Sequence, residues 1–243
     1  MRRKALLIAN LDAVGSQNDI NNWKKFLLSG RGGAWRENEI MVLTNPSKNS
    51  LNTVLCCIKN SGYDFIIVVY AGHGGWKRST ILEINPDCET IGERDLKGLS
   101  SREILILDCC RATSTETYIL DELQLKLFSD SIRSDIRIRY DARILQAIEQ
   151  QVTLYACGIG ECAYCSNNGG YYTKNLLTQS AIIPPHNEFK TINQAHTAAA
   201  IATTLEVWEK EKKNQHPNIS VARCLSSQQL IISIDTSKYG IAE

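Results

Sequence analysis

Tyr-Asp-Phe-Ile-Ile-Val-Val-Tyr-Ala at residues 63–71 and Ile-Leu-Ile-Leu at residues 104–107 decide the fold, because both are nearly continuous apolar runs. Strands that read this way are buried on both faces, as in a parallel sheet that helices cover. The first run leads directly into Gly72-His73-Gly74, and the second into Asp108-Cys109-Cys110. Because the carboxyl ends of parallel strands meet at one edge of a sheet, we expect these polar residues to gather there.

Strand-like and helix-like segments alternate along the rest of the chain, which is typical of a mostly parallel sheet with crossover helices. Besides the two runs above, we expect strands at Lys4–Asn10, Ile40–Leu43, Val152–Cys157 and Leu230–Ile234. We expect helices over Asn18–Leu28, with Asn18 or Asp19 as the N-cap, from about Ser50 onward, and over about Thr191–Lys213. The sequence therefore predicts an α/β protein with a six-stranded sheet.

The composition indicates an ordinary globular chain. Its 243 residues fit a single domain, 1–243, because no Pro/Gly/Ser-rich linker divides them. The net charge of +1 creates no overall field that would attract nucleic acid. The apolar run Ala5–Ala9 is too short for a signal peptide, and no stretch approaches the ~20 apolar residues of a membrane span. We therefore expect a cytoplasmic protein that binds neither nucleic acid nor membrane.

The segment 114–150 is the least readable part of the sequence. Arginines alternate there with isoleucines and aspartates, at Arg133, Arg137, Arg139 and Arg143. One interpretation is a solvated loop and helix face. The other is a cleavable linker between two halves of the domain.

Positions 73 and 110 carry the residue types that nucleophilic acyl transfer requires. A thiol with a pKa of ~8.5 is only partly ionised near neutral pH, and a nearby imidazolium stabilises the thiolate. The glycines around His73 let a ligand approach the backbone closely. A lone histidine or cysteine after a strand is more often structural. A Gly-His-Gly exit followed by an Asp-x-Cys exit on the next strand favours a catalytic pair.

Nine cysteines raise two further alternatives. Their odd number and their positions in apolar runs favour reduced thiols over a disulfide framework. Cys157, Cys162 and Cys165 have a spacing that could ligate zinc with a histidine, but one of them lies within an expected strand. A disulfide between the adjacent Cys109 and Cys110 would be strained. We therefore expect no metal and no organic cofactor.

These motifs resemble those of the caspase and metacaspase clan of cysteine peptidases. Tyr70–Gly74 is similar to the clan's His-Gly motif, Asp108–Cys110 to the metacaspase Asp-x-Cys nucleophile motif, and Cys110-Arg111 to the Cys-Arg pair of caspases. Further similar segments are Gly15–Asp19, Leu154–Cys157 with Glu161 and Ala163, Gly169–Thr173 and Gln215–Asn218. The resemblance covers nearly everything except 114–150, and it implies a caspase-like three-layer α/β/α sandwich.

The resemblance also implies the catalytic roles. Cys110 corresponds to the nucleophile and His73 to its acid–base partner, while backbone N–H groups of Gly74 and Cys110 would hold the oxyanion. If Cys109 attacked instead, Leu107 would stand where the motif has Asp108. The sequence departs from the metacaspase pattern just after the nucleophile, where Arg111-Ala112-Thr113 replaces His-Ser-Gly.

The specificity pocket follows from the same resemblance. Asp108 and Asp19 match pocket carboxylates of metacaspases, and Ser16 stands where that family commonly has Cys. Two anions in one pocket are costly to bury unless a cation neutralises them, so the implied substrate has Arg or Lys at P1. For Asp19, a helix cap is the alternative interpretation. If P1 is basic, the four arginines of 114–150 are candidate self-processing sites.

The function expected from these residues is a cysteine endopeptidase that hydrolyses protein or peptide substrates after Arg or Lys. Because we expect no adaptor or prodomain in so short a chain, a ligand or partner protein would have to activate the catalytic domain itself. Bacterial caspase-like defence effectors, which the chain resembles, suggest such an arrangement and an antiviral role. The alternative is a non-catalytic caspase-fold scaffold or ligand sensor.

Overall fold

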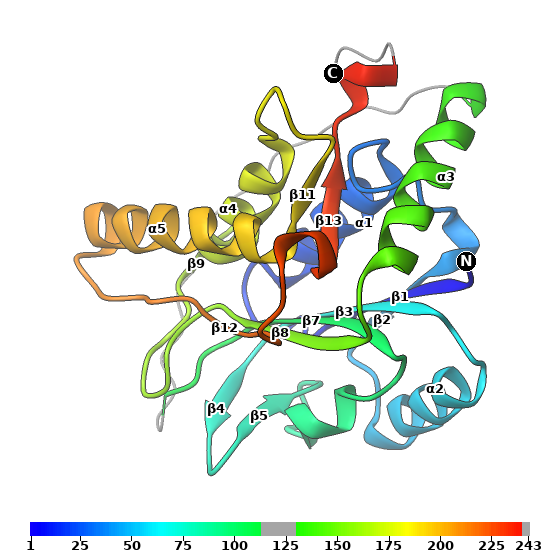
Figure 1. Ribbon diagram of the computed structural model, residues 1–243. Coiled ribbons are helices and arrows are strands. Elements are labelled where there is room, and N and C mark those ends of the chain that lie inside the picture. The colour runs from blue at the N-terminus through cyan, green and yellow to red at the C-terminus, as the bar shows by residue number, and fades with distance from the viewer. Residues whose placement is uncertain (113–129, 240–243) are drawn as a thin grey trace.

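A six-stranded sheet lies at the centre of the molecule. The computed structural model describes residues 1–112 and 130–239, and it orders the strands β12-β8-β7-β3-β1-β2 (Figure 1). The parallel strands are β1 (Arg3–Ala9), β2 (Ile40–Thr44), β3 (Phe65–Ala71), β7 (Arg102–Asp108) and β8 (Gln150–Tyr155), and the antiparallel edge strand is β12 (Asn218–Ser220). The predicted α/β class and the mostly parallel sheet are confirmed.

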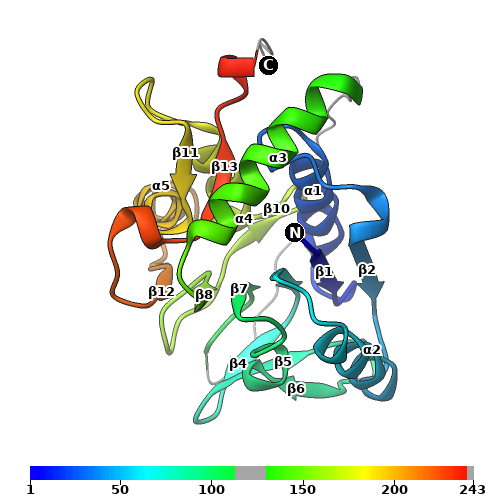
Figure 2. The same cartoon turned by 45° about the vertical axis from the view of Figure 1, so that its right-hand side comes forward.

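Two further layers cover the faces of this sheet. On one face lie α1 (Ser16–Leu28), α3 (Asp130–Gln146), α4 (Tyr171–Ala181) and α5 (Ile192–Glu211). On the other lie α2 (Lys48–Asn60) and a small antiparallel sheet of β4 (Gly74–Trp76), β5 (Thr80–Glu83) and β6 (Thr90–Gly92), which the sequence did not reveal. Figure 2 shows the central strands running between the two layers. The arrangement is the predicted three-layer α/β/α sandwich.

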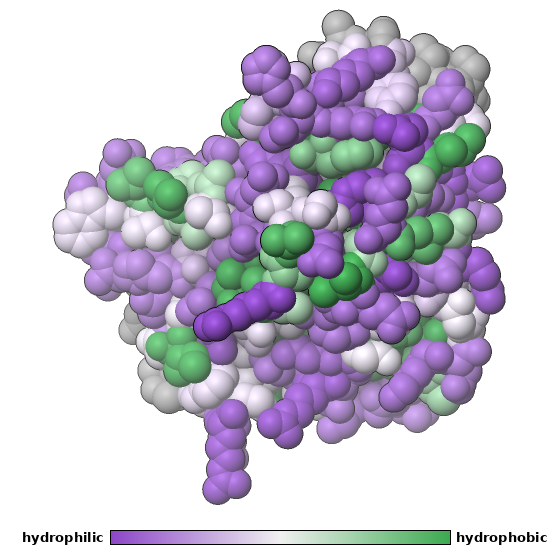
Figure 3. All heavy atoms as spheres, in the orientation of Figure 1, coloured by the Kyte–Doolittle hydropathy of each residue, from purple (hydrophilic) through white to green (hydrophobic). Residues whose placement is uncertain are grey.

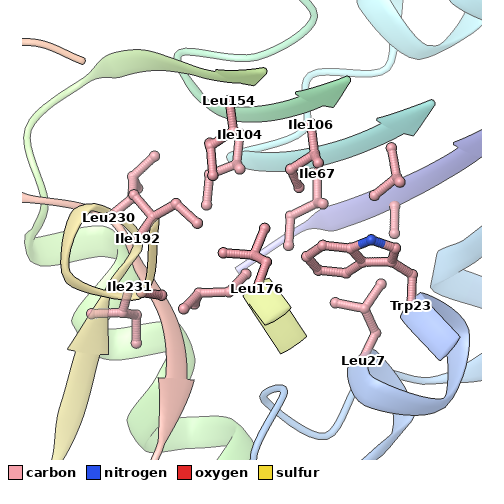
Figure 4. Close-up of a cluster of buried hydrophobic side chains, with 14 of the residues drawn as sticks. Trp23, Leu27, Ile67, Ile104, Ile106, Leu154, Leu176, Ile192, Leu230 and Ile231 are labelled. Carbon is pink, nitrogen blue, oxygen red and sulfur yellow. The ribbon is translucent and has the colours of Figure 1, made fainter. Parts of the chain in front are cut away.

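Strand β1 shows how the sequence divides its side chains between the layers. Successive strand residues point to opposite faces. Leu7 therefore joins the core beneath the four helices, whereas Leu6 and Ile8 join the core beneath α2. In the first of these cores, helix and sheet side chains converge: Trp23, Leu27, Leu176 and Ile192 against Ile67, Ile104, Ile106 and Leu154 (Figure 4).

Two details of the predicted topology are wrong. Ile231–Ile234 forms β13, which pairs with β11 (Phe189–Thr191) in a separate two-stranded sheet rather than closing the central one. An apolar run indicates that a strand is buried but not which strand it pairs with. The actual edge strand, Asn-Ile-Ser, is too short and polar to be recognised in the sequence. Helix α1 begins earlier than predicted, because Gly15, with φ 77°, is its N-cap. Neither Asn18 nor Asp19 caps it.

Helix α3 contains all four arginines of the segment 114–150. Its side chains Ile136, Tyr140 and Ile144 recur every four residues and are fully buried, whereas Ile138 is 62% exposed. The interpretation as a solvated face therefore holds for one side of the helix only. Residues 114–129 of the suggested linker lie outside the described part of the chain, and cleavage within 114–150 stays a prediction.

The arginines of α3 bind the body of the protein. Arg133 donates to the carbonyls of Leu28 and Trp35, and Arg137 forms an ion pair with Glu39. Arg139 pairs with Glu188 at 2.8 Å, and Arg143 donates to the carbonyls of Ser226 and Gln229. These contacts fasten the helix over the sheet.

In the part of the chain that the structure describes, no helix is both long enough and apolar enough to cross a bilayer. Exposed apolar side chains lie scattered among hydrophilic ones on the face drawn in Figure 3.

A buried histidine predicts a pH dependence of stability. His196 is 4% exposed, Tyr172 Oη lies 2.7 Å from its Nδ1, and burial lowers its pKa to about 4. The unfolded chain binds a proton at this residue below pH ~6.5 and the folded one does not, so the free energy of unfolding falls as the pH drops from 6.5 toward 4. We expect His196 to account for at most about 3 kcal/mol of this loss.

Urea denaturation at several pH values measures the effect. His196→Gln keeps a hydrogen-bonding partner for Tyr172 but does not titrate, so its stability should depend less on pH over this range than that of the wild type. If the free energy of unfolding fell equally with pH in the two proteins, the prediction would be contradicted.

Candidate active site

The carboxyl ends of β3 and β7 bring the predicted catalytic residues to one place. Ala71 of β3 lies opposite Asp108 of β7, and the N–H of Gly72 donates to the Asp108 carbonyl at 3.2 Å. His73 and Cys110 each follow two residues beyond these positions. Both line one cavity at this edge of the sheet, here called the edge cavity, whose wall also includes Asp19, Asp108, Cys162 and Cys165.

Short contacts hold the backbone of His73 in place. Its carbonyl accepts hydrogen bonds from the Tyr70 hydroxyl at 2.6 Å and from the Glu83 N–H at 3.0 Å. The side chain is 18% exposed, and Nε2 lies 3.9 Å from Oδ2 of Asp12. The imidazole is thus presented at the cavity by a fixed backbone, with a carboxylate beside it.

The adjacent cysteines have different environments. Cys109 is 2% exposed and packs in the core beneath α2, whereas Cys110 is half-buried and lines the edge cavity. The Cys110 thiol donates to the carbonyl of Ala163 at 3.7 Å. Burial, together with the neighbouring thiol of Cys162, raises its pKa to about 12. Among the described residues, Cys110 and His73 share no hydrogen bond.

Arg111 fixes the segment that follows the nucleophile candidate. Its guanidinium is 4.0 Å above the Tyr155 ring and 5.0 Å above the Trp76 ring, and it donates to Thr80 Oγ1 at 3.2 Å and to the Cys157 carbonyl at 3.3 Å. The side chain is 5% exposed. Arg111 stands where the metacaspase pattern has histidine, and its contacts give it a structural role.

Asp19 and Asp108 are buried side by side at the base of the cavity. Both carboxylate oxygens of Asp19 accept from the Gly170 N–H at 3.0 Å. Oδ2 of Asp108 accepts from the Thr173 N–H at 3.0 Å and from its hydroxyl at 2.6 Å. Burial raises the pKa of both carboxyl groups, and the charge of Asp108 raises that of Asp19 further. The helix-cap interpretation of Asp19 is wrong, since its oxygens bind another segment.

Two glycines make this arrangement possible, and sequence reasoning did not identify them as site residues. A Cβ on Gly169 would lie 2.2 Å from Oδ1 of Asp19, and a Cβ on Gly170 would lie 2.4 Å from Oδ2 of Asp108. They form β10 (Gly169–Gly170), which pairs with β9 (Cys165–Ser166). The Gly-Gly pair just before a helix was the available signal for a close backbone approach.

The other two predicted site residues lie in or beside the edge cavity, whose wall includes Ser16 but not Gly74. Ser16 lines it, but its hydroxyl donates to the Asn10 carbonyl at 2.7 Å and so holds the turn after β1. Gly74 packs against the cysteine pair: a Cβ there would lie 2.7 Å from Cys109 Sγ and 2.8 Å from the Cys110 carbonyl oxygen. The Gly74 and Cys110 backbones are therefore neighbours.

The cysteines do not form a metal cluster in the described part of the chain, where no three His, Cys, Asp or Glu side chains are arranged to hold an ion. The Cys157 thiol donates to the carbonyls of Cys109 and Glu161 instead. All nine cysteines are free, as the sequence predicts.

Comparisons with known proteins agree with this geometry. A family model for the caspase domain, peptidase family C14, matches residues 2–226. Caspase-1 from Spodoptera frugiperda aligns over 90% of this chain and 86% of its own, with a TM-score of 0.59 and 13% identity. A protein from Geobacter sulfurreducens aligns over 95% and 97% respectively, with a TM-score of 0.56 and 12% identity. At such identities the likeness shows the fold alone. No curated protein matches the sequence.

The close approach at Gly170 predicts a sensitive position. Gly170→Ala forces a methyl group against the Asp108 carboxylate, so we expect the free energy of unfolding to fall by about 1–3 kcal/mol. Gly92→Ala is the matched control, because a Cβ there meets nothing closer than 3.7 Å. Thermal or urea denaturation of both variants measures the difference. Equal stability of the two variants would contradict the prediction, because it would show that the Asp108 carboxylate and the loop can move to make room for the methyl group.

Proposed function

This chain belongs to the caspase-domain family of peptidases, and we propose that it is a cysteine endopeptidase that cleaves peptide bonds after Arg or Lys. One observation carries the proposal: a single cavity is lined by a thiol, an imidazole and two buried carboxylates, those of Cys110, His73, Asp19 and Asp108. The first two supply acyl-transfer chemistry, and the last two supply a reason for a basic substrate. No organic cofactor or metal takes part in this scheme.

The proposed reaction assigns a step to each of these groups. The Cys110 thiolate attacks the carbonyl carbon of the P1 residue, and the N–H groups of Gly74 and Cys110 stabilise the oxyanion that forms. His73 protonates the leaving amine and then takes a proton from the water that hydrolyses the thioester. The contact between the Gly74 and Cys110 backbones supports their joint role, since the two amides must point at one oxygen.

The carboxylate pair supports specificity for a basic P1 side chain. Burial raises the pKa of both carboxyl groups, and the charge of Asp108 raises that of Asp19 further. A guanidinium or ammonium entering the cavity neutralises the pair, so that binding energy comes from relief of repulsion as well as from direct contact. A substrate with Asp at P1 would add a third negative charge and is excluded.

The resting geometry supports a protein that waits for a trigger. The Cys110 thiol donates to the Ala163 carbonyl, its pKa is raised to about 12, and His73 lies beside Asp12. Attack requires the thiol to leave Ala163 and to meet the imidazole, which then stabilises the thiolate. A ligand or partner that displaces the segment around Ala163 would produce this change. Participation in bacterial defence stays a prediction from the resemblance.

The same resting geometry favours one alternative, a caspase-fold protein that binds a basic ligand without cleaving it. The two functions share the carboxylate pocket and differ in whether Cys110 reacts. Covalent labelling of this sulfur therefore separates them.

We expect Cys110→Ala and His73→Ala each to lower cleavage of Arg or Lys peptides by roughly 10³-fold or more, because each removes a reacting group. Fluorogenic peptides measure the rate, and a P1-Arg acyloxymethyl ketone reports the nucleophile by mass mapping. Cys56→Ala is the control, since that cysteine is exposed on α2. A label on another cysteine, or none on correctly folded protein, would reject the peptidase assignment.

Asp19→Asn and Asp108→Asn should each lower kcat/KM for P1-Arg substrates by about 10²-fold or more, since a buried partner of the substrate cation loses its charge. Neither should destabilise the protein at pH 7, because a carboxyl group with a raised pKa costs stability once ionised.

In the wild type, KM for these substrates should rise on acidification as the pair takes up protons. Exposed Asp135 provides the control variant Asp135→Asn. Preference for P1 Asp would refute the pocket model and leave the nucleophile untouched.

A further inference from the structure

Two thiols meet in the edge cavity, those of Cys110 and Cys162. The neighbouring Cys162 thiol is among the groups that raise the pKa of the Cys110 thiol. Both residues are half-buried, line the cavity and are free of any disulfide. A small molecule that enters the cavity therefore reaches both sulfurs at once.

The backbone sets the two residues opposite each other. The Arg111 N–H donates to the Glu161 carbonyl at 2.9 Å, and the Gly160 N–H donates to the Arg111 carbonyl at 3.0 Å. This reciprocal pattern is antiparallel, with one extra residue on the 160–161 side, and it places residue 110 beside residue 162. Facing residues between such bonded pairs have Cα atoms about 4.5 Å apart. Disulfides form at Cα separations of roughly 4.4–6.8 Å.

The loop that carries Cys162 is held in this position. Fully buried Gln215 accepts from the Tyr164 N–H at 2.8 Å and donates to the Ala156 carbonyl at 2.8 Å. The Glu161 carboxylate accepts from the Gly158 N–H at 3.0 Å and from the His216 N–H at 2.8 Å. These hydrogen bonds hold the loop on both sides of Cys162.

We propose that Cys110 and Cys162 are a site of reversible oxidation, at which hydrogen peroxide converts the two thiols into an intramolecular disulfide. As a control of catalysis it rests on the proposed function, in which Cys110 is the nucleophile. The bond would tie this sulfur to the loop that carries Ala163, whose carbonyl already accepts its hydrogen bond, and would leave no thiol to attack a substrate.

The chemistry balances with peroxide as the oxidant. One sulfur, as thiolate, attacks a peroxide oxygen; the O–O bond breaks, and a sulfenic acid and hydroxide form. The second thiol attacks the sulfenic sulfur, the S–S bond forms, and water leaves with the thiol proton. Overall, two thiols lose two hydrogen atoms and one peroxide becomes two waters. A dithiol reductant reverses the step.

Peptide mapping tests the proposal without any need for peptidase activity. The full-length reduced protein is treated with hydrogen peroxide, remaining thiols are alkylated, and the non-reduced digest is analysed by mass spectrometry. We expect a peptide pair that joins Cys110 to Cys162 as the dominant cross-link, and its loss after dithiothreitol. Cys165→Ser should retain the link, whereas Cys162→Ser should abolish it.

The outcomes separate this proposal from the proposed function. A Cys110–Cys162 link in a protein that never cleaves peptides upholds the oxidation site and removes its role in peptidase control. Active enzyme whose Cys110 becomes sulfinic acid without a link, or pairs with Cys165, overturns the oxidation site alone. The wild-type map decides between these results even if a variant fails to fold.

Discussion

The edge cavity depends on the hydrogen bonds that keep two like charges buried side by side. Asp19 and Asp108 come from α1 and β7, and both are met by donors from the start of α4: the Gly170 N–H, the Thr173 N–H and the Thr173 hydroxyl. The first amides of a helix lack partners of their own, and the helix dipole favours negative charge at that end. Three elements are thereby fixed around the carboxylate pair, which the proposed function assigns to a basic substrate side chain.

The nucleophile candidate is held by a different set of contacts, and these restrain it. Arg111 anchors the segment between two aromatic rings, and the opposing loop receives the Cys110 thiol through Ala163 and Cys162. The Cys110 thiol is thus hydrogen-bonded to the Ala163 carbonyl and shares no hydrogen bond with His73 among the described residues. The carboxylate pair and the thiol line one cavity but are held by different contacts.

Sequence reasoning reached the sheet and the two strand exits because their signals are local. Continuous apolar runs in β3 and β7 mark buried strands, and Gly-His-Gly and Asp-Cys-Cys follow them directly. Sequence reasoning failed where a feature depends on a contact with a residue that is distant in the sequence. The pairing of β13 with β11, the cap of α1 at Gly15, and the fit of Gly169 and Gly170 against two carboxylates all depend on contacts that no single segment reveals. The contact of Cys162 with Cys110 belongs to the same class.

An enzyme that cleaves after basic residues, as proposed here, could also cleave other copies of itself. The arginines of α3 bear on this self-cleavage. A scissile bond must lie in extended chain, with its P1 side chain released into the pocket of the enzyme. Arg133 and Arg137 lie within a helix, and their guanidinium groups already hold backbone carbonyls and Glu39. Autolysis at either bond would first require the helix to unwind and give up these contacts. While α3 stays folded, the helix shields both bonds from degradation.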